Sequence, residues 1–102
     1  MSPRGDGLRR IEGEIAREKA AALGRAGERL EEALAALDHL ARAIEATGDE
    51  ARRDELRDAY RATRTRARTA RLHLLIQRED LGLRSHRVVD QQFPEPVLPP
   101  WL

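Results

Sequence analysis

The sequence of 102 residues contains no cysteine and only three aromatic residues, which are Tyr60, Phe93 and Trp101. The lack of cysteine excludes a disulfide framework and any thiolate metal site. The longest uninterrupted apolar run is the five residues 33–37, which is too short for a membrane-spanning helix or for the apolar part of a secretory signal. We therefore expect a cytoplasmic protein that makes no contact with a membrane.

What the chain does contain is helix-forming material. A length of 102 residues supports one small domain. Alanine and leucine dominate the 40% of residues that are hydrophobic, and both favour helix over strand. Because aromatic side chains are so few, the core is expected to be thin. These features predict an all-α fold.

Mostly apolar residues recur at intervals of three and four over two segments, which predicts two amphipathic helices. In the first segment they are Ile11, Ile15, Ala22, Ala26, Leu30, Ala33, Leu37, Leu40 and Ile44. In the second segment they are Leu56, Tyr60, Thr63, Ala67, Ala70, Leu74 and Leu81. Between them, Gly48 is expected to take the left-handed conformation and Asp49 to cap the second helix. So short a turn, at residues 47–49, forces the helices into a long antiparallel hairpin.

Three regions follow from this pattern. Residues 1–7 lack periodicity and are expected to form a flexible leader, and residues 8–82 form the helical hairpin. In residues 83–102, Ser85 is expected to cap a short helix that Pro94 ends, and a proline-rich tail follows. We expect four apolar residues of this region to cover the hairpin near the end of the second helix, or to dock on a protein partner. They are Phe93, Val97, Leu98 and Trp101.

Two faces away from the predicted seam suggest self-association. Leu72 and Ile76 project about 200° away from the seam of the second helix, so one partner helix cannot bury the whole apolar run there. The first helix carries a stripe of small residues on its back. Each helical glycine costs about 1 kcal/mol relative to alanine, and this cost suggests that another backbone approaches the stripe closely. The stripe consists of Gly13, Ala20, Gly24 and Gly27. We therefore predict a homodimer that forms a four-helix bundle, with these residues at its interface.

A basic ridge accompanies the second seam. Residues 59–78 hold six arginines and no acid, and four of the arginines each follow a seam position by one residue. These four are Arg61, Arg64, Arg68 and Arg71. Across the hairpin, Arg64 is expected to lie level with Glu31, and Arg57 with Asp38. The other ridge arginines either pair with acids of a second chain or bind phosphate, and the near-zero net charge of +1 favours the first interpretation.

No pattern in the sequence predicts catalysis, a cofactor or a metal site. None of the three histidines has a glutamate three residues before it, as a carboxylate-bridged metal site in a bundle requires. Ser85 is better explained as a helix cap than as a nucleophile. We expect a non-enzymatic structural or interaction protein that acts as a homo-oligomer. The alternative is a nucleic-acid-associated or regulatory protein that uses the basic ridge between Arg61 and Arg78.

One segment resembles a known group of proteins. Residues 75–86 read Leu-Ile-Gln-Arg-Glu-Asp-Leu-Gly-Leu-Arg-Ser-His, in which an apolar residue, Gln-Arg-Glu, a glycine and a histidine follow one another. This order is similar to the C-terminal motif of short bacterial helical-hairpin proteins that form a domain of unknown function. The resemblance covers about the last third of the chain. It implies a helical fold and no particular activity.

Overall fold

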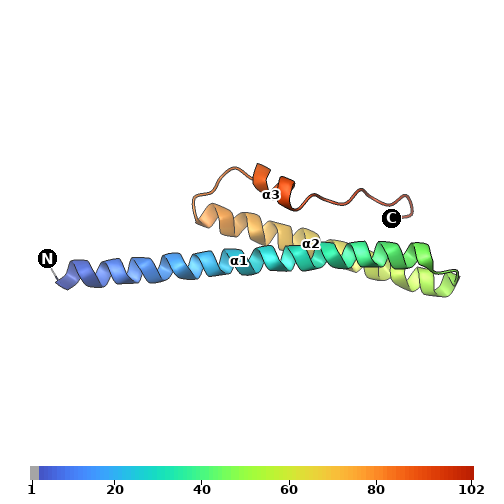
Figure 1. Ribbon diagram of the computed structural model, residues 1–102, viewed down its shortest axis with the longest axis horizontal. Helices are drawn as coiled ribbons and strands as arrows, with labels where there is room; N and C mark the ends of the chain where they lie inside the picture. The colour runs from blue at the N-terminus through green and yellow to red at the C-terminus, as the bar shows by residue number, and fades with distance from the viewer. Residues whose placement is uncertain (1–2) are drawn as a thin grey trace.

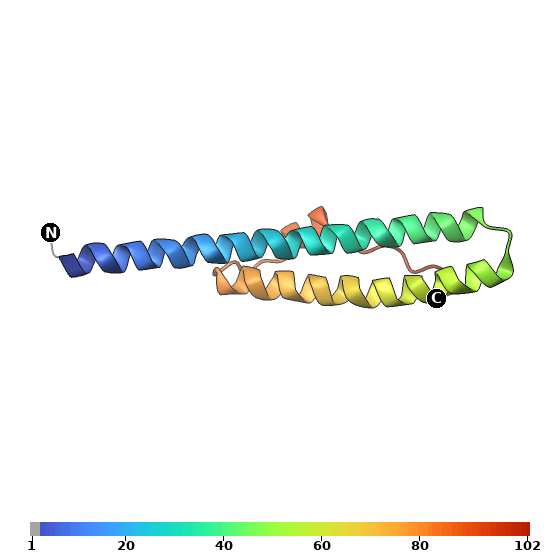
Figure 2. The same ribbon diagram turned by 90° about the horizontal axis from the view of Figure 1, so that it is seen from below.

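The structure is a computed structural model that describes residues 3–102. It consists of α1 (Pro3–Ala46), α2 (Glu50–Asp80) and α3 (Arg87–Gln92), and these residues include no strand. Figures 1 and 2 show α1 and α2 lying side by side in opposite directions, joined by a tight turn. With α3 and the tail included, the molecule is 72 Å along its longest axis and only 15 Å along its shortest. The predicted all-α antiparallel hairpin is confirmed.

The first helix begins earlier than its apolar pattern suggests. It starts at Pro3, so the predicted flexible leader is wrong for residues 3–7, while residues 1 and 2 lie outside the described part. Proline is well suited to the first helical position, because its fixed φ matches the helix and its missing N–H has no partner there anyway. Asp6 lies in the first turn, where a negative charge interacts favourably with the helix dipole.

The core is the seam between α1 and α2. The buried residues of α2 are the first six of the seven seam positions predicted for it, and only Leu81 is left half-buried. In α1 the buried apolar residues are Ala26, Leu30, Ala33, Leu37 and Ile44. Ile11 and Ile15 are exposed because α2 does not reach them: it ends at Asp80, which pairs with Lys19 at 3.6 Å. The first helix therefore extends past the second.

The turn uses the predicted cap but not the predicted glycine conformation. The Asp49 side chain accepts hydrogen bonds from the backbone N–H groups of Ala51 and Arg52. Gly48 does not adopt positive φ, so that expectation is wrong. Instead, Arg53 donates a hydrogen bond of 2.6 Å to the carbonyl oxygen of Thr47. This side chain satisfies a carbonyl that follows the last turn of α1.

The left-handed glycine lies at the end of α2. Gly82 has φ of 82°. Its N–H donates to the carbonyl oxygen of Glu79 and the N–H of Leu83 donates to that of Arg78, both at 2.9 Å. This pair of bonds is the Schellman arrangement, which requires a left-handed residue at that position.

The short C-terminal helix, whose N-cap position is His86 and not Ser85, starts one residue later than predicted. No side-chain hydrogen bond caps it, so the expected cap at Ser85 is wrong. The backbone carbonyl of Ser85 instead accepts a hydrogen bond of 2.7 Å from Arg78. The helix ends at Gln92, two residues before Pro94, as the proline rule predicts.

After α2 the chain reverses, and α3 and the tail run back along the hairpin and form a third layer on it (Figures 1 and 2). Val89 and Phe93 pack on the half of the seam that contains Leu30 and Leu74, whereas Trp101 packs on the other half. The tail was expected to stay near the C-terminal end of α2. It instead extends along α2 toward the turn and reaches the half of the seam that contains Tyr60. Val97 is 92% exposed, which corrects its predicted contact with the hairpin. An extended chain cannot direct all its side chains toward one surface.

The two glycines give a direct stability test. We expect Gly82→Ala to lower the free energy of unfolding by about 1–2 kcal/mol, because a Cβ strains the left-handed conformation. Gly48→Ala is the control, since no positive φ and no atom within 4 Å opposes a Cβ there. It should leave stability unchanged or raise it by up to about 1 kcal/mol. Thermal unfolding at matched protein concentration measures both, and equal losses would contradict the assignment.

Candidate functional site

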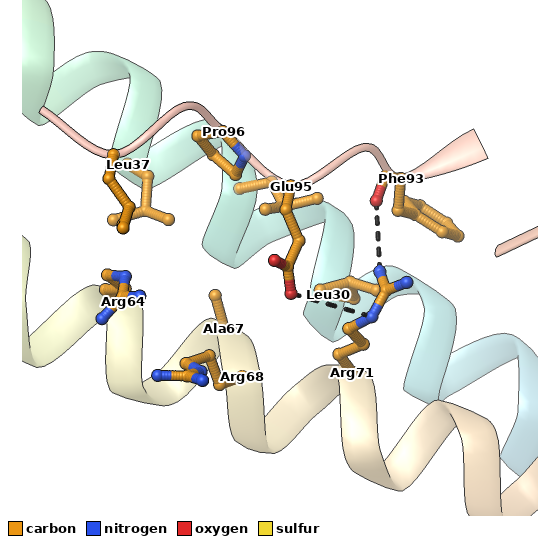
Figure 3. Close-up of a pocket in the computed structure, with 11 residues that line it drawn as sticks. Leu30, Leu37, Arg64, Ala67, Arg68, Arg71, Phe93, Glu95 and Pro96 are labelled. Atoms are coloured by element: carbon orange, nitrogen blue, oxygen red, sulfur yellow. Dashed lines mark hydrogen bonds and ion pairs between the residues drawn. The ribbon is translucent and has the colours of Figure 1, made fainter. Parts of the chain in front are cut away.

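A hollow lined by side chains lies where the basic ridge meets the tail. It is a cavity of about 110 Å³ between α1, α2 and the segment after α3. Figure 3 shows Arg64, Arg68 and Arg71 along one side of it and the tail across the other. Apolar side chains of Leu30, Leu37 and Ala67 also line it. Three of the four predicted ridge residues therefore converge on one site.

Arg71 fastens the tail to the hairpin. Its guanidinium forms an ion pair with the carboxylate of Asp90 and donates a hydrogen bond of 3.3 Å to the carbonyl oxygen of Phe93. A second carboxylate, that of Glu95, lies 3.9 Å from its Nε. Figure 3 shows the guanidinium directed at the tail. The sequence left Arg71 without an acid in its own chain, and the partners it lacked come from α3 and the tail.

The ion pairs predicted across the hairpin do not form. Arg57 pairs with Glu50 and Asp54 on its own helix, at 3.3 and 3.0 Å, and not with Asp38. Arg61, predicted to lack an acid in its own chain, pairs with Asp58 at 3.2 Å. Acids three residues away on the same helix face are near neighbours, so they compete well with acids on the facing helix.

Arg64 and Arg68 have no acidic or hydrogen-bonding partner among residues 3–102, so the predicted pair of Arg64 with Glu31 is also wrong. They flank the cavity with two positive charges above an apolar floor. Guanidinium groups in such a position can donate hydrogen bonds to a carboxylate or phosphate. A volume of about 110 Å³ is nevertheless well below the roughly 300 Å³ at which pockets for small-molecule ligands begin. With the tail in place, the site is a small, positively charged cavity that the tail covers.

A second anchor holds the end of the tail. The ring of Trp101 meets that of Tyr60 edge to face, with centroids 5.0 Å apart and planes at 75°. The Arg57 guanidinium lies 6.0 Å from the centre of the Trp101 ring, at the outer limit of a cation–π contact. Sequence reasoning expected Trp101 to dock but did not identify Tyr60 as its partner. The only available signal was that Tyr60 is the one aromatic residue in the hairpin.

The predicted interface residues lie on open faces. Leu72 and Ile76 are 56% and 50% exposed on the side of α2 away from the seam. In the small-residue stripe of α1, a Cβ built on Gly24 or Gly27 would meet nothing within 4 Å, so nothing in this chain approaches them closely. Of the stripe, Gly13 and Gly27 are half-buried, and Ala20 and Gly24 are exposed.

The three histidines do not form a cluster. His39 and His73 are exposed, and His86 lies with its Nε2 3.0 Å from a carboxylate oxygen of Glu79. Within residues 3–102 no three acidic or histidine side chains are grouped to hold a metal ion. In the same part of the chain, no helix has the length and apolar character needed to cross a membrane.

Comparison of the chain with protein-family models, with curated proteins and with solved structures finds no match in any of the three. The resemblance of residues 75–86 to bacterial helical-hairpin proteins therefore stays a hypothesis.

The role of Arg71 is testable against a matched neighbour. We expect Arg71→Ala to weaken docking of α3 and the tail by about 1 kcal/mol, because the lost partners are largely exposed carboxylates. Amide hydrogens of residues 89–93 should then exchange about fivefold faster. Arg68→Ala, one turn earlier and without an acidic partner in the described chain, should leave that exchange unchanged. Equal effects of the two variants would show that Arg71 does not fasten the tail.

Proposed function

We propose that the protein is a small structural or interaction protein that works as a homo-oligomer, most simply a dimer that forms a four-helix bundle. One observation carries the proposal: among the described residues, more large apolar side chains are exposed than buried. Seven are buried besides the core alanines, and ten are exposed. The exposed ones are Leu8, Ile11, Ile15, Leu72, Ile76, Leu83, Val88, Val97, Leu98 and Leu102.

The energetics of the hairpin support the same conclusion. Four of the hairpin's ten buried apolar residues are alanines, which bury little surface at about 25 cal/mol per Å². Folding must nevertheless offset about 1–2 kcal/mol of backbone entropy for each ordered residue. Small chains with thin cores commonly gain the missing stability by association.

The expectation of a cytoplasmic protein belongs to this proposal and rests on the cysteine-free composition.

Leu72 and Ile76 are the interface side chains best placed for a four-helix bundle. They lie one helical turn apart on the back of α2, so a second hairpin packed there buries both at once. Arg66, which is exposed and has no partner in the described chain, lies on the same helix and would find acids on a second copy. Burying this face leaves the seam and the docked tail intact.

The alternative function is nucleic-acid association through the basic ridge, and two arginines of the ridge remain available for it. Arg64 and Arg68 carry no partner in residues 3–102, but Arg71 is engaged by Asp90 and Glu95, which also bring negative charge to the ridge. Phosphate binding by so few arginines should be weak and detectable only at low salt. A gel-shift assay with duplex DNA at low salt separates the functions, because binding that Arg64→Ala and Arg68→Ala abolish would favour the alternative.

Light scattering of the full chain tests self-association. We expect a mass of at least twice 11.5 kDa, and Leu72→Glu or Ile76→Glu should lower it because a buried charge opposes the interface. Leu98→Glu is the control: it replaces an apolar residue of similar exposure, but on the tail. A cooperatively folding monomer of 11.5 kDa would contradict the proposal.

A further inference from the structure

The first helix has an end that no other part of the described chain covers. α2 stops at Asp80, beside Lys19, so residues 3–18 of α1 project beyond the hairpin. We call this segment the overhang, and Figure 1 shows it as the blue end of α1. At 1.5 Å per residue it is about 24 Å long. Neither α3 nor the tail runs toward it, since both turn back along the hairpin (Figure 1).

The apolar stripe of α1 continues along the overhang, where it is exposed to solvent. Leu8, Ile11 and Ile15 are 58%, 54% and 45% exposed. Their spacing of three and four residues continues the stripe of α1 that packs on α2 through Ala26 and Leu30. The apolar face is therefore continuous with an interface that the structure already contains. Only its covering helix is missing.

The charges of the overhang indicate which helix covers that face. Residues 3–10 contain three arginines and one aspartate, a net charge of +2. Residues 11–18 contain three glutamates and one arginine, a net charge of −2. A second overhang laid antiparallel sets each positive half against a negative half, whereas a parallel one opposes like charges along its whole length. The charges of the overhang are therefore complementary to those of a second overhang only when the two are antiparallel.

We propose that the overhang is a self-docking surface, which pairs antiparallel with the overhang of a second copy of this chain across a two-fold axis near Ile11. Setting Pro3 of one copy level with Lys19 of the other places Ile11 opposite its own copy and Leu8 close to Ile15 of the other. The second overhang then occupies the path that α2 would follow if it continued. Each copy supplies the covering helix that the other lacks.

This inference deepens the proposed function and rests on self-association, but it names a surface separate from Leu72 and Ile76. Two copies joined at their overhangs extend in opposite directions from the axis, so they cannot also meet through Leu72 and Ile76. Combined use of the two isologous surfaces therefore gives an assembly larger than a dimer. Loss of one surface should leave a dimer held by the other. The two claims can therefore fail independently.

Cysteine cross-linking tests the geometry, because the natural chain contains no cysteine. Under mild oxidation we expect Ile11→Cys to form a disulfide-linked dimer rapidly, since the two copies of residue 11 meet at the axis. Leu8→Cys and Ile15→Cys should cross-link at least tenfold more slowly, because in antiparallel helices their copies lie roughly 10 Å apart along the axis. Ala51→Cys, exposed at the far end of the hairpin, controls for random collision.

Equal cross-linking at positions 8, 11 and 15 would indicate a parallel pair and overturn the proposed geometry. A second measurement uses sedimentation of Ile11→Glu, a change at an exposed position that should leave the hairpin folded, as circular dichroism would verify. We expect the overhang contact to weaken at least tenfold, which leaves a dimer that Leu72→Glu then dissociates. An oligomer that Ile11→Glu leaves unchanged overturns the overhang contact and retains the proposed function. A wild-type monomer overturns both.

Discussion

The structure depends on one narrow contact, the alanine-rich seam between α1 and α2. Ala26, Ala33, Ala67 and Ala70 let the two helices lie close together, but they remove little apolar surface from water. Two helices also give each seam residue a neighbour on one side only. The hairpin consequently leaves a groove along its length and large aliphatic side chains exposed to solvent. Both are covered only when a further layer of protein packs on the hairpin.

Part of that layer comes from the chain itself. The segment after α2 reverses at Gly82 and returns along the groove, held by Arg71 through its ion pairs and by Trp101 through its contact with Tyr60. Between these anchors the chain is extended and Val97 faces solvent. The tail thus covers the middle of the groove without reaching the overhang or the back of α2. Those two surfaces are the ones that self-association would bury.

Periodicity in the sequence predicts the helices well because it is a local property that a straight hairpin preserves. It identified the six buried positions of α2, and the Asp49 cap followed from its position before the second helix. The ion pairs could not be found in this way, since long arginine side chains choose among several acids at similar distance. The partners of Arg71 depended on where the tail returned. At the turn, the Arg53 side chain satisfies the Thr47 carbonyl, and Gly48 does not adopt positive φ. These outcomes are set by tertiary geometry, which single-residue patterns do not encode.

The central claim is that a thin-cored hairpin gains stability from a second copy of itself. The concentration dependence of the thermal unfolding midpoint tests it most directly, because association stabilises the folded chain by mass action. The account predicts that the midpoint rises steadily as protein concentration increases from the low micromolar range. A midpoint that stays constant over the same range, with a cooperative transition, would show that one chain buries enough apolar surface to fold alone.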